Sequence, residues 1–180
     1  MKKLFLVLAL AFAGIFTANA QVWIGGSANA NINNAGTAFG IAPEVGYSFT
    51  GTPWTVAAAV SYNYMDIKGV SPEFGQYNPH FFVISPYVRY SICNIEKFAL
   101  FMDLQGDFAL QSDQGPDKGG YRVGLWPGIA WMATKHWTAA FRFAFLGYNH
   151  CAYFHETGYG DGFVMKFATS APSFGLYYNF

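Results

Sequence analysis

The sequence predicts an all-β fold, an eight-stranded antiparallel up-and-down transmembrane β-barrel, and three observations lead to it. A pattern of proline, an apolar residue and usually an aromatic recurs around Pro43, Pro86, Pro127 and Pro172, at intervals of 43, 41 and 45 residues. Each copy lies in a run where apolar residues alternate with small or polar ones, so the repeated unit is a pair of strands. The chain is also 53% hydrophobic and only 11% charged, against roughly 25% charged in ordinary soluble domains.

The N-terminal segment has the three parts of a secretory signal peptide. Lys2 and Lys3 precede an apolar run from Leu4 to Phe16, and Ala18-Asn19-Ala20 follows as a cleavage site. We therefore expect residues 1–20 to be removed and residues 21–180 to form the barrel. After the leader, no apolar run approaches the roughly 20 residues that a spanning helix needs. A closed barrel that turns its apolar face outward to lipid accommodates this composition, because closure satisfies the backbone hydrogen bonds.

The strands are predicted from the alternation of apolar residues with small or polar ones. A membrane barrel differs from a soluble one in which of these two sets faces the interior. The expected strands cover about residues 22–32, 37–49, 54–64, 80–92, 98–107, 121–131, 137–145 and 174–180. Large apolar residues occupy one face of each strand and small or polar residues the other. An eight-stranded interior is narrow and holds side chains without a wide pore. The small and polar set therefore faces inward. In the seventh strand this assignment places Phe141, Phe143 and Phe145 outward and Arg142 inward.

Several tyrosines and tryptophans near the strand ends are expected to form the aromatic girdles at the two membrane interfaces. They are Tyr47, Trp54, Tyr62, Tyr64, Tyr90, Trp131 and Trp137.

The connections differ in length in a way that predicts orientation. Residues 50–53, 93–97 and 134–136 are short turns, whereas residues 67–79, 111–119 and 149–162 form longer loops. Bacterial barrels keep short turns in the periplasm and long loops outside. Both termini are then periplasmic. The four prolines cannot donate a ladder hydrogen bond, so we expect a bulge or one missing bond at each.

Six charged residues fall on inward positions of the predicted strands. They are Glu44, Arg89, Asp103, Asp107, Arg122 and Arg142. Because buried charges must be paired, we expect three cations and three anions to form an interior ion network. The network either fills the interior or gates a narrow conduit.

The end of the chain carries a family resemblance. Phe174, Leu176, Tyr178 and Phe180 alternate up to the last residue, and this run resembles the insertion signal of outer-membrane barrels. With the leader, eight strands and unequal connections, the mature chain resembles the small outer-membrane β-barrel family of the OmpA transmembrane domain and OmpX type. The resemblance implies a location in the outer membrane. It also implies contact with outer-membrane lipid and lipopolysaccharide, and recognition by the barrel-insertion machinery.

For function, the sequence favours a non-enzymatic barrel with a structural or surface-interaction role, the long loops offering a surface to an extracellular partner. The alternatives are an ion or small-solute conduit through the charged interior, and a lipid A-modifying enzyme. No serine, histidine and acid converge on one predicted face, so we assign no catalytic residue. Without the leader, eight cations face ten anions, which makes nucleic acid an unexpected partner.

We also assign no cofactor, no metal site and no disulfide. His150, Cys151, His155 and Glu156 cluster in one loop, but their spacing matches no ligand pair on a helix or strand. Cys93 and Cys151 are expected at opposite ends of the barrel, too far apart to form a disulfide.

Overall fold

The computed structural model describes residues 21–33, 36–67, 80–110, 120–150, 161–167 and 173–180. The signal-peptide prediction, the fourth proline of the repeat and most of the predicted 149–162 loop lie outside these ranges. The described strands are β1 (Gln21–Asn33), β2 (Gly36–Ser48), β3 (Trp54–Ile67), β4 (His80–Ile95), β5 (Phe98–Ala109), β6 (Gly120–Met132), β7 (Trp137–Arg142), β8 (Ala144–His150), β9 (Gly162–Phe167) and β10 (Ser173–Asn179). No helix within these ranges is long and apolar enough to cross a membrane.

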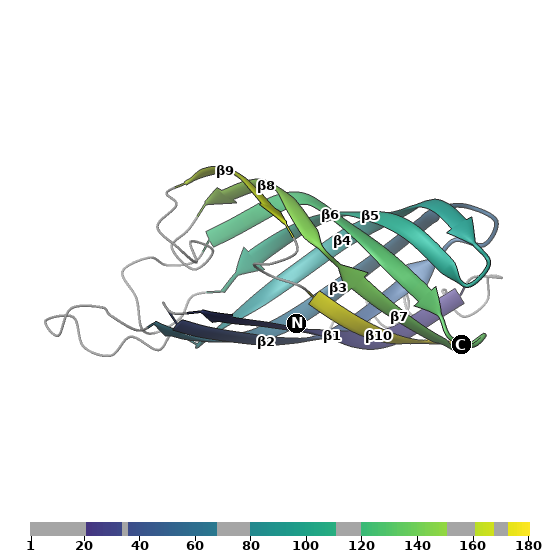
Figure 1. The fold of residues 1–180 in the computed structure, drawn as a ribbon, viewed down its shortest axis with the longest axis horizontal. Coiled ribbons are helices and arrows are strands. Elements are labelled where there is room, and N and C mark those ends of the chain that lie inside the picture. The colour runs from purple at the N-terminus through teal and green to yellow at the C-terminus, as the bar shows by residue number, and fades with distance from the viewer. Residues whose placement is uncertain (1–20, 34–35, 68–79, 111–119, 151–160, 168–172) are drawn as a thin grey trace, which may run out of the picture.

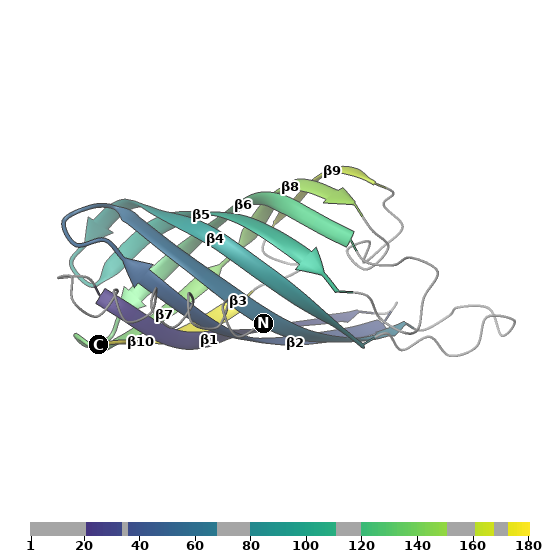
Figure 2. The ribbon, with the colours of Figure 1, turned by 180° about the vertical axis from the view of Figure 1, so that it is seen from behind.

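The ten segments occupy eight strand positions around one closed antiparallel barrel, as the sequence predicted. β7 and β8 share one position beside β6, and β9 and β10 share the next, since β9 pairs with β8 and β10 with β7. β1 to β6 are neighbours in chain order, and β6 then pairs with β7 and β8 in succession. β7 and β8 are two parts of one strand, interrupted at Phe143. β10 pairs with β7 on one side and with β1 on the other. The β1–β10 pair, which closes the barrel, runs from Trp23 opposite Asn179 to Asn29 opposite Ser173. Figure 1 and Figure 2 show these strands tilted along one elongated barrel.

Three short turns and both ends of the described chain share one end of the barrel, which we call the short-turn end (Figure 1). Gln21 pairs with Ser48 just before the β2–β3 turn. The amide of Phe180 donates to the carbonyl of Val22 at 3.1 Å. The opposite end, where β1 and β2 meet, is the loop end.

The outer surface is apolar, as the alternation predicted. Aromatic side chains pack together near both ends, including Trp54 with Tyr90 at the short-turn end and Tyr62 with Phe82 towards the loop end. Between them lie exposed aliphatic residues such as Leu104. Exposed outward residues also include Trp131, Trp137, Ile129, Val88, Val60, Leu176 and Tyr148. Two aromatic belts separated by an aliphatic band are the surface expected of a lipid-facing barrel.

The interior near the short-turn end is packed with aromatic rings against glycine. Trp23, Tyr87, Phe101 and Tyr177 are buried in one cluster. A Cβ added at Gly46 would overlap the Trp23 ring. At this position the inner wall must be bare backbone, because the Trp23 ring lies directly against it.

The three described prolines of the repeat coincide with gaps in the ladder, and the gap always faces the following strand. Pro43 pairs with Gly26 of β1, but the β2–β3 register passes from Ile41 opposite Tyr62 to Glu44 opposite Ala59. Pro86 pairs with β3, and the β4–β5 register passes over it from Ile84 to Tyr87. At both prolines the ladder therefore has the gap that was expected.

Pro127 differs, because the neighbouring strand is bulged beside it. The β6 register passes from Gly128 opposite Arg142 to Leu125 opposite Leu146, and the Phe143 amide donates to the Pro127 carbonyl at 3.1 Å. A bulge reverses the alternation of the residues that follow. Phe145 is consequently buried, at 2% exposure, and the prediction that it faces outward is wrong.

Candidate functional site

All six charged residues of the predicted interior network lie inside the barrel, where they form two groups. The larger group, which we call the hub, contains Glu44, Arg89, Asp103 and Arg142. The smaller group pairs Asp107 with Arg122 nearer the loop end. The division follows the order of the residues along β5, because Asp103 and Asp107 are on the same face, four positions apart.

Asp103 is the centre of the hub and is fully buried. The Arg89 guanidinium donates two hydrogen bonds to it, from Nε to Oδ1 at 2.7 Å and from Nη2 to Oδ2 at 2.9 Å. Arg142 Nε donates to the same Oδ2 at 2.8 Å. One carboxylate of β5 therefore binds two guanidinium groups, Arg89 of β4 and Arg142 of β7. Bidentate charge-assisted bonds of this kind are among the strongest in proteins.

Glu44 neutralises the second cation and extends the hub across the lumen. Arg142 Nη2 lies 3.5 Å from Glu44 Oε2, an ion-pair contact without hydrogen-bond geometry. The Tyr87 and Tyr177 hydroxyls donate to Oε2 at 2.7 and 3.3 Å, and Ser27 Oγ donates to Oε1. The hub thus joins β1, β2, β4, β5, β7 and β10.

Aromatic rings pack against both cations of the hub. The Arg89 Cζ atom lies 3.8 Å from the centroid of the Phe101 ring and 5.9 Å from that of Tyr177. Arg142 lies 5.0 Å from the Tyr87 ring. Cation–π contacts are strongest where the cation is desolvated. Ion pairs and rings together form a transverse layer of side chains inside the barrel.

The second group is simpler and more exposed. Arg122 Nε and Nη2 both lie 2.7 Å from Asp107 Oδ2, and Gln105 Nε2 donates to Oδ1 at 2.6 Å. The Arg122 side chain is 22% exposed, twice the 11% of Arg89. It packs over the Trp126 and Phe145 rings. This pair lines the wall of the barrel and does not bridge distant strands.

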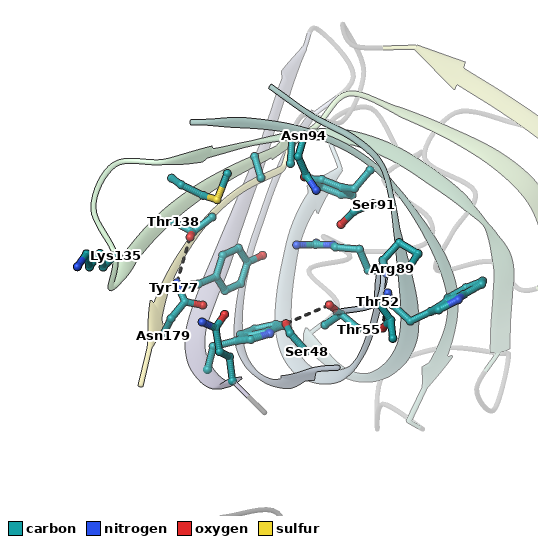
Figure 3. A pocket seen from close by; sticks show the side chains of 18 of the residues that line it. Ser48, Thr52, Thr55, Arg89, Ser91, Asn94, Lys135, Thr138, Tyr177 and Asn179 are labelled. Carbon is teal, nitrogen blue, oxygen red and sulfur yellow. Dashed lines mark hydrogen bonds between the residues drawn. The ribbon is translucent and has the colours of Figure 1, made fainter. Parts of the chain in front are cut away.

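A cavity of about 490 Å³ lies at the short-turn end, on the side of the hub where Arg89 is found. We call it the vestibule. Turn residues, among them Thr52, Thr134 and Lys135, form its rim, and Trp23, Arg89, Phe101 and Tyr177 line it more deeply. Figure 3 shows Arg89 and Tyr177 reaching toward each other from opposite walls. Hydrogen bonds between Ser48 and Thr55 and between Asn179 and Thr138 tie adjacent strands of the wall (Figure 3).

Sequence reasoning missed several polar members of the interior, four of which bear on the network. Tyr87, Tyr177 and Ser27 complete the coordination of Glu44, and Lys166 of β9 lies opposite the inward Phe145, between exposed Met165 and Phe167. The first three could have been found by carrying the alternation through each strand without regard to residue type. Lys166 was missed because the last strand was started at Phe174.

The remaining residues singled out in the sequence lie outside the hub. Phe174, Leu176 and Phe180 are exposed on the outer face, and Tyr178 stacks on His136 and packs against Trp137. Cys93 is exposed and unpaired. His150 Nδ1 lies 2.7 Å from Asp161 Oδ2, and no metal-binding group occurs among the described residues. Cys151, His155 and Glu156 lie outside those residues.

Comparisons with known proteins agree with the fold. The structure resembles the crystal structure of the outer membrane protein OprG from Pseudomonas aeruginosa, with a TM-score of 0.51 and 12% sequence identity, over 91% of this chain and 96% of that one. No protein-family model matches the sequence, and no curated protein matches it either. At this identity the likeness concerns the architecture alone, a closed all-β barrel of the kind that outer-membrane proteins adopt.

Proposed function

We propose that this protein is a non-enzymatic integral outer-membrane barrel with an internally plugged lumen, which serves as a structural scaffold for its surface loops. The observation that carries the proposal is the hub. Its ion pairs, together with the hydroxyls of Tyr87, Tyr177 and Ser27, connect six strands across the lumen, and Asp103 is fully buried among them. An interior held by paired charges resists opening and obstructs passage, because separating one pair leaves an uncompensated buried charge.

The apolar exterior supports an outer-membrane location with lipid and lipopolysaccharide around the barrel. In this proposal the short-turn end faces the periplasm and the loop end faces the outside, where the loops meet an extracellular partner. Phe174, Leu176, Tyr178 and Phe180 act as the segment that the insertion machinery recognises. Their exposed apolar side chains on the last strand are suited to that role.

A second candidate function, a gated conduit for ions or small solutes, is favoured by the vestibule. This cavity already opens the barrel as far as Arg89, so the hub is the obstruction that a conduit would have to move. The two candidates differ in one property, the conductance of the unmodified barrel.

Planar-bilayer recording of the refolded mature chain separates the candidates. The matched variant is the double substitution Glu44→Gln with Arg142→Met, which removes one cation and one anion and leaves the Arg89–Asp103 pair balanced. A plugged scaffold gives no discrete current steps for the wild type. Discrete wild-type steps whose size changes in the double variant would establish the conduit and overturn the scaffold proposal.

A further inference from the structure

The lining of the vestibule is cationic and rich in hydrogen-bond donors, and the vestibule plays no part in the scaffold role. Among the described residues that line it, Arg89 and Lys135 are charged and both are cationic, whereas none is acidic. The other polar members are amides and hydroxyls, for example Asn94 and Ser91. Each carries at least one hydrogen-bond donor.

The charge that faces the vestibule is positive although the hub is balanced overall. Arg89 lines the cavity, but its partner Asp103 does not and has no exposed surface. The ion pair therefore presents its cationic end to the cavity. Lys135 on the β6–β7 turn adds a second, exposed cation at the rim.

The Arg89 guanidinium has one edge left to donate. Nε and Nη2 are committed to the two oxygens of Asp103, and the Phe101 ring covers one face. Within the described part of the chain, no hydrogen bond of Nη1 is found, and the side chain keeps 11% of its surface exposed. The edge formed by Nη1 and the second N–H of Nη2 matches a carboxylate or phosphate group, which a guanidinium binds through two parallel bonds.

We infer that the vestibule binds a small organic anion, with a carboxylate or phosphate group on the free edge of Arg89 and Lys135 attracting it at the rim. A volume of about 490 Å³ lies within the ~300–1,000 Å³ of small-molecule sites. The aromatic rings beside Arg89 lower the local dielectric and strengthen the contact. The hydroxyls and amides of the wall provide donors for the rest of the solute.

Methyl NMR of the refolded mature chain in detergent tests this inference. Met132 lines the vestibule, whereas Met165 is exposed on the outer face, so the two methyl groups are probe and internal control in one sample. Succinate, and separately inorganic phosphate, is titrated at constant ionic strength. We expect a saturable shift of the Met132 signal, no shift of Met165, and no saturable response to succinamide, the neutral analogue of succinate.

Two variants locate the contact. Arg89→Lys keeps the charge beside Asp103 but loses the free edge, and should weaken binding by about tenfold or more. Lys135→Gln changes an exposed turn and should weaken binding by about two- to fivefold. Folding of each is checked by its gel mobility before and after boiling.

The inference is overturned if neither anion gives a saturable Met132 shift, or if succinamide binds as well as succinate. Unchanged affinity in both folded variants would also overturn it. Saturation by succinate alone would identify carboxylates as the ligands, and saturation by phosphate alone would identify phosphates. The titration is independent of conductance and of membrane orientation, so its result is separate from that of the scaffold proposal.

Discussion

At the residue scale, Asp103 is the buried centre of the hub. It has no exposed surface and bonds to both Arg89 and Arg142. Asp107, on the same face of the same strand, has one cationic partner, and that partner is partly exposed. Both carboxylates are buried, so the two aspartates form a matched pair for measuring what double pairing and the burial of the cationic partners contribute.

Asp103→Asn should lower the free energy of unfolding by about 3–5 kcal/mol, the usual cost of removing one partner of a buried ion pair. It leaves two buried guanidinium groups with Glu44 as their remaining anion. Asp107→Asn should cost less, because solvent reaches Arg122. Urea titration of the lipid-reconstituted proteins measures both values. Equal, small losses would contradict the buried hub.

The six network charges could be predicted from sequence because a charge on an otherwise apolar strand must face the interior of a membrane barrel. Tyr87 and Tyr177 could not be separated from the girdle tyrosines in the same way. The amphipathic ring suits both the membrane interface and a buried polar cluster, so residue type alone does not decide. Which ion pairs form depends on the register between strands distant in sequence, and composition does not specify register.

At the element scale, the main departure from expectation is the bulge at Phe143. Strict alternation from Trp137 places Phe145 outward, but one extra residue opposite Pro127 turns it inward against Trp126, with ring centroids 4.8 Å apart. The proline repeat predicted irregular pairing at this height. It could not predict whether the partner strand would skip a bond, as β3 does, or add a residue.

Spin labels at two adjacent positions test the bulge. A label at Leu146→Cys, in a background that carries Cys93→Ser and Cys151→Ser, should be readily relaxed by oxygen dissolved in lipid, because that position faces outward in β8. The same label at Phe145→Cys should be shielded from oxygen, since the native ring is buried. The reverse order of accessibility would mean that the alternation of β7 continues through β8 unbroken.

At the scale of the whole molecule, the account depends on which face of the barrel is apolar. Closure was predictable from eight expected strands, an apolar chain whose runs after the leader are too short for a spanning helix, and too few charges for a soluble surface. The vestibule was not predictable, because its volume depends on how far the rings of Trp23, Phe101 and Tyr177 reach across the lumen. A cavity is a property of packing in three dimensions and leaves no periodic mark in the sequence.

The measurement that tests the central claim most directly is gel mobility of the detergent-refolded mature chain with and without boiling, beside far-ultraviolet circular dichroism. A closed lipid-facing barrel resists unfolding by detergent at room temperature, so we expect a β spectrum and two bands of different mobility. A single band, together with a protein that stays soluble in plain buffer, would contradict the account. It would mean that the large apolar side chains line the interior and that the hub is not where we describe it.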